Sequence, residues 1–155
     1  MRYWLMKSEP SDYSIDDLAR DKTASWWGVR NYQARNFMRD GMRVGDRAFF
    51  YHSSCAVPGI YGIIEIARAA YPDHTAWDPE NHHYDPKSTP ERPLWFMVDV
   101  RFRRELEKPV TLTAIKMQPA LKQMRLVQRG SRLSVMPVTA KEWNTILKLA
   151  EENFQ

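Results

Sequence analysis

The feature that most constrains the fold of this chain is regular alternation of apolar and polar residues. Between residues 94 and 102 the apolar side chains fall on every second position, which is typical of a β-strand with one buried face. A second alternating run covers 59–67, and Gly62 within it indicates a bulge or a close approach to the backbone. Further strands are expected at 3–6, 47–53 and 132–138.

Short helices are expected between and after these strands. Ser14 followed by Asp16 and Asp17 predicts a helix start, and Thr139 with Glu142 matches a capping box. The helix after Thr139 carries apolar residues at 143, 146, 147 and 150, a stripe that should face the core. Two more helices are expected at 32–38 and 111–117. Because no βαβ series or internal repeat is present, the pattern favours an α+β domain with a curled mixed sheet.

Length and composition are those of one globular domain. A chain of 155 residues can bury a core without disulfides, and we expect residues 1–155 to form a single domain. No apolar run is long enough to cross a bilayer, so no membrane partner is expected. The single cysteine, Cys55, and the lack of a signal-peptide pattern predict an intracellular protein, cytoplasmic in a bacterium or nuclear in a eukaryote.

The residues that usually carry metals, cofactors or catalysis form no recognisable set. Histidines at 52, 74, 82 and 83 lack the usual metal-ligand spacing, and neither glycine-rich phosphate-binding motif is present. We therefore predict no metal and no cofactor. His52, Asp85 and Asp99 are the side chains that an enzyme acting on a nucleotide would use, but no nucleophile and base can be paired, so the prediction is a non-enzyme.

The segment 26–37 points to nucleic acid. It reads Trp-Trp-Gly-Val-Arg-Asn-Tyr-Gln-Ala-Arg-Asn-Phe, which interleaves aromatic rings with guanidinium and amide groups and contains no acid. Stacking on an aromatic side chain contributes roughly 1–3 kcal/mol per base, and arginine can neutralise a phosphate. Packing in the core is the alternative for any single aromatic residue in this segment.

Charge is distributed unevenly along the chain. The formal net charge is +4, but residues 22–39 and 110–140 hold four and five basic residues respectively and no acid. We call these two stretches the acid-free segments. If the fold brings them together, their field would attract a polyanion; if it does not, they are two separate solvated surfaces.

Five motifs in order resemble the EVE domain family. They are Met-Lys-Ser-Glu-Pro at 6–10, the segment 26–37, Phe-Phe-Tyr-His-Ser at 49–53, Tyr-Asp-Pro at 84–86 and Arg-Leu-Ser-Val-Met-Pro at 132–137. The resemblance spans residue 3 to about 149 and implies a single EVE domain over 1–155. The implied fold is a PUA-like open mixed β-barrel with flanking short helices. The family is similar to the YTH readers of methylated adenine and is regarded as binding modified bases, with modified cytosine in DNA the leading suggestion and no catalysis.

The resemblance also implies roles for individual residues. Trp26 would form an aromatic wall of the base pocket, and the other base-binding residues would be Lys7, Ser8, Asn31, Ser53, Ser134, Val135 and Pro137. The phosphate-binding residues would be Arg30, Arg35, Arg39, Arg129 and Arg132. Trp27 departs from the family pattern, which has Asp at this position, and this leaves the base preference open.

The resulting prediction is a non-catalytic reader that holds a modified base in an aromatic pocket, with modified cytosine in DNA as the leading candidate. An RNA-binding module of the PUA-like type is the alternative within the same class, because single-stranded RNA offers bases that are already splayed. An enzyme acting on a modified nucleotide is the alternative from another class. Nucleic acid is the expected partner in the first two cases, and the oligomeric state is left open.

Overall fold

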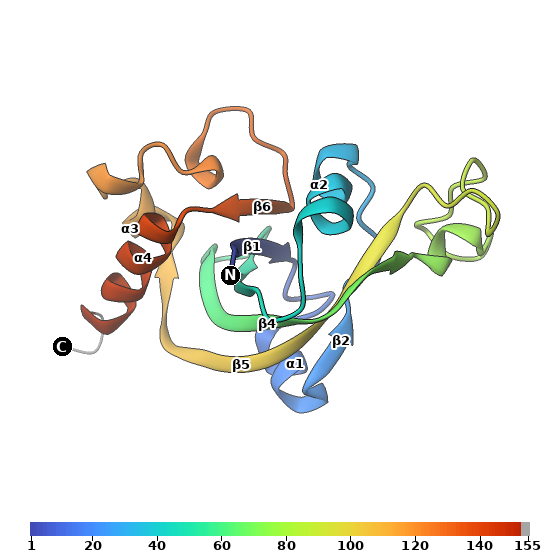
Figure 1. The fold of residues 1–155 in the computed structure, drawn as a ribbon. Helices are drawn as coiled ribbons and strands as arrows, with labels where there is room; N and C mark the ends of the chain where they lie inside the picture. The colour runs from blue at the N-terminus through green and yellow to red at the C-terminus, as the bar shows by residue number, and fades with distance from the viewer. Residues whose placement is uncertain (153–155) are drawn as a thin grey trace.

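The computed structural model describes residues 1–152, and within that range six strands form one mixed sheet in the order β2-β5-β4-β3-β1-β6 (Figure 1). β1 (Tyr3–Ser8) runs parallel to β3 (Arg47–His52), and all other neighbouring strands are antiparallel. β2 (Thr23–Ser25) and β6 (Val135–Val138) are the two edges, and these edges do not pair with each other. The predicted mixed sheet of an α+β domain is therefore confirmed, as a curled sheet with two open edges.

The two long strands, β4 (Gly59–Pro72) and β5 (Phe96–Thr111), bend the sheet. Their pairing register shifts repeatedly, including a shift beside Gly62, and such bulges increase local twist and bending. A Cβ atom at Gly62 would lie 2.5 Å from Cδ1 of Ile15, so the backbone there approaches a core side chain closely. Both expectations for Gly62 are thus confirmed.

The other predicted strands are present with changed limits. The strand expected at 94–102 begins at Phe96 and continues to Thr111, and the one expected at 132–138 is confined to Val135–Val138. β2 was not predicted, because three residues are too few to display alternation.

The helices begin where their caps predict. α1 (Ile15–Asp21) starts with a capping box between Ser14 and Asp17. α4 (Ala140–Glu152) starts with another, in which the Glu142 carboxylate accepts from Thr139 N–H at 2.9 Å and the Thr139 hydroxyl accepts from Glu142 N–H at 3.1 Å. The remaining helical elements are α2 (Tyr32–Asn36), the π-helical turn η1 (Phe37–Gly41), α3 (Leu112–Lys116) and 3-10 turns at His74–Trp77, Pro119–Leu121 and Arg125–Val127.

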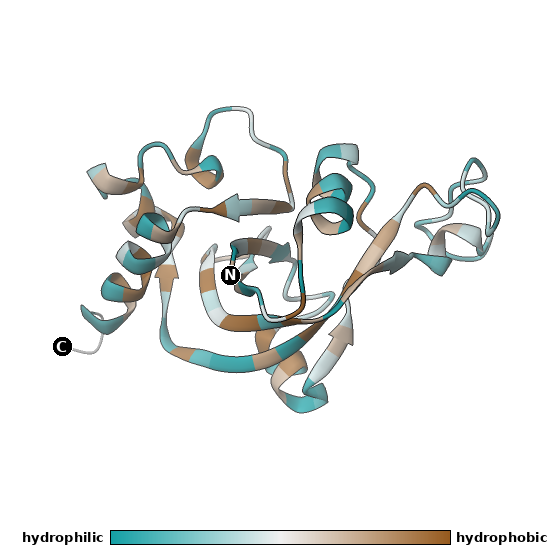
Figure 2. Ribbon diagram, in the orientation of Figure 1, coloured by the Kyte–Doolittle hydropathy of each residue, from teal (hydrophilic) through white to brown (hydrophobic). Residues whose placement is uncertain are grey.

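β3 is buried on both faces, whereas β4 alternates buried and half-buried residues between Ile60 and Ile66, and Figure 2 shows hydrophobic bands along β4. Phe49 stacks on Trp143 of α4 with ring centroids 3.9 Å apart, whereas its neighbour Phe50 contacts Trp26 on the opposite face. The apolar stripe of α4 therefore faces the core as predicted, with Trp143, Ile146 and Ala150 buried.

The segment 73–95 extends from the end of β4 as a loop that is tied to the body of the protein (Figure 1). The fully buried carboxylate of Asp73 pairs with Arg30 at 3.0 Å and accepts from Gly28 N–H at 2.8 Å. The indole N–H of Trp95 donates to Asp85 at 2.8 Å. These contacts give order to a segment without a strand.

Candidate nucleic-acid interface

A polar pocket lies between the start of α2 and the segment 125–133, and we call it the basic pocket. Its volume is about 520 Å³, which is within the range of small-ligand sites. It is lined by Asn31, Gln33, Arg125, Gln128, Arg129, Gly130, Ser131, Arg132 and Leu133. The two acid-free segments therefore meet in the fold, and no acidic residue is among those that line the pocket.

Two buried leucines hold the 125–133 segment so that its polar residues face outward. Leu126 and Leu133 are 8% and 7% exposed, and the chain turns between them at Gly130, whose φ of +78° lies in the left-handed region. Leu133 leads directly into β6, which pairs with β1. The sequence thus presents five consecutive polar or glycine positions, 128–132, on an anchored loop.

Three arginines supply the charge of the basic pocket. Arg125, Arg129 and Arg132 are exposed, and none of them forms an ion pair within residues 1–152. The guanidinium of Arg125 lies 5.3 Å from the ring centroid of Phe37. Uncompensated guanidinium groups around a concave surface concentrate positive potential, so this pocket can attract and hold a polyanion. Arg129 and Arg132 were predicted for this role, whereas Arg125 and Gln33 were not singled out.

Asn31 adds a hydrogen-bonding group at the mouth of the basic pocket. Its side-chain oxygen caps α2 by accepting from Ala34 N–H at 2.9 Å. The exposed side-chain nitrogen has no hydrogen-bond partner within the described residues and faces the pocket that Asn31 lines. An amide fixed in this way can donate to a carbonyl or ring nitrogen of a base.

The carboxyl ends of β1 and β3 bring together four of the predicted base-binding residues. Because these strands are parallel, both end at the same edge. Ser53 N–H donates to the carbonyl of Ser8 at 3.0 Å, and Lys7 N–H donates to the carbonyl of Ser134 at 2.8 Å. The hydroxyl of Ser8 donates to the carbonyl of Tyr13 at 2.6 Å. Lys7, Ser8, Ser53 and Ser134 are therefore neighbours, and their contact with a base stays a prediction.

Lys7 is the cation of this group. Its ammonium nitrogen lies 5.6 Å from the ring centroid of Tyr51, and burial lowers the pKa of Lys7. The same burial raises the pKa of Tyr51 to about 12. A partly desolvated ammonium interacts more strongly with an anion or a carbonyl than a hydrated one does, since less water screens it.

Trp26 does not fit the predicted role of an open aromatic wall. Trp26 is 9% exposed, and its ring meets the ring of Phe50 edge-on at 5.5 Å. Its backbone N–H donates to the carbonyl of Val98 at 2.7 Å. Lys7 lies against Tyr51, whose side chain points to the opposite face of β3 from Phe50. The structure therefore places Trp26 in the core, where it can offer a base an edge and not a whole face.

Within the segment 26–37, the exposed aromatic rings are those of Trp27 and Tyr32. Trp27 is 48% exposed and is bordered edge-on by His82 and His83, with centroids at 6.5 and 5.2 Å. Tyr32 is 54% exposed and stacks on Trp95 at 4.7 Å. Neither was assigned to the site from sequence, although both belong to the aromatic and basic segment that drew attention to it.

Three of the five predicted phosphate-binding arginines are engaged by the protein itself. Arg30 pairs with Asp73 and also donates to the carbonyls of Val29 and His83 and to the hydroxyl of Thr75, at 2.8–3.1 Å. Its guanidinium holds the 73–95 loop, so the prediction of a phosphate contact does not fit this geometry.

Arg35 and Arg39 have similar internal partners. Arg35 donates to the carbonyl of Leu94 at 2.9 Å and to the side-chain oxygen of Asn36 at 2.7 Å. Arg39 pairs with Asp40 at 2.9 Å. Sequence could not reveal these contacts, and they leave Arg129 and Arg132 as the predicted arginines whose guanidinium groups have neither a hydrogen bond nor an ion pair within residues 1–152.

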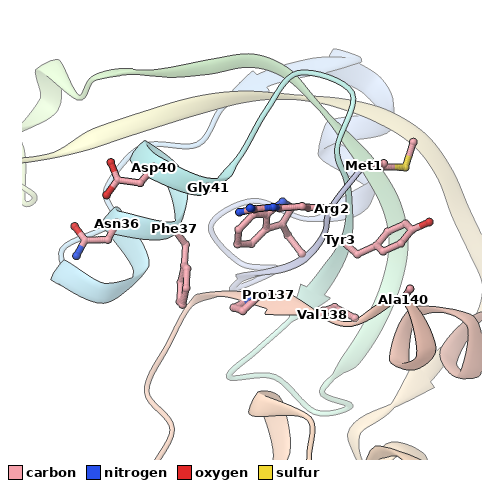
Figure 3. A pocket seen from close by; sticks show the side chains of 11 residues that line it. Met1, Arg2, Tyr3, Asn36, Phe37, Asp40, Gly41, Pro137, Val138 and Ala140 are labelled. Atoms are coloured by element: carbon pink, nitrogen blue, oxygen red, sulfur yellow. The ribbon is translucent and has the colours of Figure 1, made fainter.

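Val135 and Pro137 lie along β6 and not at the basic pocket. Val135 is fully buried opposite Met6, and Pro137 pairs with Trp4. Pro137 lines a second cavity of about 630 Å³ beside the first residues of β1, which we call the N-terminal pocket (Figure 3). Of the residues predicted for the mouth of the base site, Ser134 therefore lies beside Lys7, whereas Pro137 lies at the N-terminal pocket.

The three side chains that an enzyme would have used each form a hydrogen bond to a different residue of the protein. The imidazole of His52 accepts from Ile15 N–H at 3.1 Å, and burial lowers its pKa. Asp85 accepts from Trp95, and Asp99 accepts from the hydroxyl of Tyr71. Within the described residues no three His, Cys, Asp or Glu side chains gather as a metal site. No helix in the same range is long and apolar enough to span a membrane.

Comparison with known proteins gives consistent matches. The family model described as the EVE domain matches residues 2–149. Thymocyte nuclear protein 1 of Mus musculus is 46% identical over 168 residues, which cover 96% of this chain and 74% of that protein. The protein of the same name from Homo sapiens is 44% identical over 169 residues, covering 97% of this chain and 74% of that protein.

Solved structures share the fold. A crystal structure of a Pseudomonas syringae protein has a TM-score of 0.93 and 55% identity, covering 96% of this chain and 99% of that one. The human THYN1 protein in complex with 5-methylcytosine-containing DNA has a TM-score of 0.91 and 44% identity, covering 97% of this chain and 98% of that one. An ASCH protein from Zymomonas mobilis, with 9% identity and a TM-score of 0.56, shows a likeness of fold alone.

Proposed function

Because this chain belongs to the EVE domain family, we propose that it is a non-catalytic reader of modified cytosine in DNA. The observation that carries the proposal is the complex of the human relative with 5-methylcytosine-containing DNA, a protein of nearly the same fold. The basic pocket supports it independently, because three unpaired arginines suit a phosphate backbone. The curled open sheet is consistent with the PUA-like barrel that the family resemblance implies.

The proposed division of roles follows the geometry. Arg125, Arg129 and Arg132 hold the phosphates, and the free amide nitrogen of Asn31 and the ammonium of Lys7 contact the polar edge of the base. Ser8, Ser53 and Ser134 shape the neighbouring strand ends. Trp26 lies behind this surface and supports it through Phe50.

Magnitudes limit how selective such a reader is. A fully buried methyl group contributes about 0.8 kcal/mol, which is close to a fourfold preference. Extruding a base from a duplex costs a few kcal/mol, so phosphate contacts must supply most of the binding free energy. A 5-methyl group alone thus gives a modest preference on top of strong, salt-dependent binding.

Titration of the protein with matched oligonucleotides tests the proposal. The probes are DNA strands that differ only by the 5-methyl group of one cytosine, together with RNA of the same sequence. We expect the methylated DNA to bind several-fold more tightly than unmethylated DNA. Equal affinity for the two DNA strands would overturn the assignment, and tighter binding of the RNA would favour the RNA-binding alternative.

Charge variants test whether binding depends on the arginines of the basic pocket or only on the positive net charge of the protein. Arg129→Ala and Arg132→Ala should each weaken all strands alike and reduce the salt slope by about one unit. Arg101→Ala is the matched control, because Arg101 is equally exposed but lies on β5 beside Glu65 and outside the pocket. If the control weakens binding as much as the pocket variants, the basic pocket is not the phosphate site.

A further inference from the structure

The N-terminal pocket lies at the opposite end of β1 from the strand ends that carry Lys7 and Ser8. It is lined by Met1, Arg2, Tyr3, Trp4, Asn36, Phe37, Asp40, Gly41, Pro137, Val138 and Ala140. Figure 3 shows Arg2 between Phe37, which hangs from η1, and Tyr3 on β1. At about 630 Å³ the pocket is large enough for a small ligand, and none of the roles described so far uses it.

Its lining combines aromatic surface with the guanidinium group of Arg2. Arg2 forms no ion pair within residues 1–152, whereas the acid of the pocket, Asp40, is neutralised by Arg39 at 2.9 Å. Gly41 packs closely against the indole that lines the pocket, because a Cβ atom there would lie 2.7 Å from Trp4 and 3.7 Å from Nη1 of Arg2. Planar apolar walls beside a free guanidinium suit a flat ring that carries a negative charge nearby.

The N-terminal pocket and the basic pocket share a wall. Phe37 lines the first, Arg125 lines the second, and the Arg125 guanidinium lies 5.3 Å from the Phe37 ring. The chain also runs from one pocket to the other, from Leu133 to Pro137. Four residues of extended chain span about 13 Å, and successive nucleotides of a DNA strand rise about 3.4 Å. A strand held at the basic pocket would therefore reach the N-terminal pocket within about four nucleotides.

We propose that the N-terminal pocket is a second nucleotide subsite, which takes one base of the same strand and sets Arg2 against its phosphate. The inference rests on the proposed function and extends it, because it makes the reader sensitive to a nucleotide about four positions from the modified cytosine. The base enters beside the ring of Phe37, between that ring and Arg2.

A blocked pocket tests the subsite without removing core residues. Ala140→Tyr adds a ring to an exposed position that lines the pocket, and Asn144→Tyr adds the same ring at an exposed position of the same helix away from it. Two DNA probes are titrated: a trinucleotide centred on 5-methylcytosine, and a strand of about ten nucleotides with the same centre. Ala140→Tyr should weaken the long probe about tenfold, as loss of one stacked base does, and leave the trinucleotide unchanged.

A second variant and an NMR measurement distinguish failure of the second subsite from failure of the proposed function. Arg2→Gln should also weaken only the long probe, and the amide NMR signal of Gly41 should shift with the long probe but not with the trinucleotide. If the long probe binds the wild type and both pocket variants equally, or if the variants weaken both probes alike, the second subsite is wrong while the reader function stands. If neither probe binds the wild type, the proposed function itself fails.

Discussion

Asp73→Asn is the sharpest test of how the candidate interface is held in place. The buried carboxylate accepts from Gly28 N–H at 2.8 Å, from Thr75 N–H at 2.9 Å, from the Thr75 hydroxyl at 2.6 Å and from Arg30 at 3.0 Å. An amide in its place removes the charge and turns an NH₂ group toward donors. Breaking one partner of a buried ion pair costs roughly 3–5 kcal/mol. Because Arg30 is 20% exposed and can be partly hydrated, we expect about 3 kcal/mol.

Urea unfolding followed by tryptophan fluorescence measures this loss. Asp78→Asn is the control, because Asp78 is exposed in the same loop and its carboxylate accepts a single hydrogen bond within residues 1–152, from Glu80 N–H at 2.9 Å. The control should lose less than about 1 kcal/mol. An Asp73→Asn protein that is as stable as the control would refute the claim that Asp73 and Arg30 anchor the segment that carries the interface.

The pH dependence of the same measurement gives a second check. Burial by itself would raise the pKa of Asp73, but hydrogen bonds from Gly28, Thr75 and Arg30 bring it below its ordinary value. A depressed pKa in the folded state stabilises the protein above the unfolded pKa of about 3.9, and this contribution is lost as the pH falls through the folded value. The stability gap between wild type and Asp73→Asn should therefore narrow below about pH 4.

Three further predictions concern other parts of the fold. Gly62→Ala should cost about 1–3 kcal/mol in chemical denaturation, because its Cβ would lie 2.5 Å from Ile15, and an unchanged midpoint would contradict the close packing. Thr139→Ala removes the α4 cap and should lower the melting temperature by about 3 °C, a shift that a Ser at the same position should largely restore. Burial lowers the pKa of His52, so the folded state resists protonation and wild-type stability should fall as the pH drops from about 7 to 5, whereas His52→Gln should show a shallower slope in pH-dependent denaturation.

Sequence patterns predicted the framework well because each rests on local chemistry. The capping boxes at Ser14 and Thr139 depend on residues three positions apart, and the bulge at Gly62 depends on the absence of a side chain. The acid-free segments also pointed to a real surface, since both contribute to the basic pocket. Their meeting depends on the pairing of β6 with β1, which composition alone does not determine.

The roles of individual residues in 26–37 could not be read from sequence. Trp26 and Trp27 are adjacent and chemically identical, and only the backbone bond from Trp26 to Val98 decides which indole turns inward. Arg30 reads as a free cation until Asp73, 43 positions away, is brought against it. Long-range partners thus decide which of several similar side chains remains available to a ligand.

The order in which strands are laid side by side also has a consequence for biosynthesis. β1 lies between β3 and β6, so β1 is synthesised well before the strand that covers its second edge. The basic pocket, whose two walls come from residues 31–33 and 125–133, cannot exist on a nascent chain that has not yet emerged that far. The proposed binding of nucleic acid therefore becomes possible only after the segment 125–133 has docked.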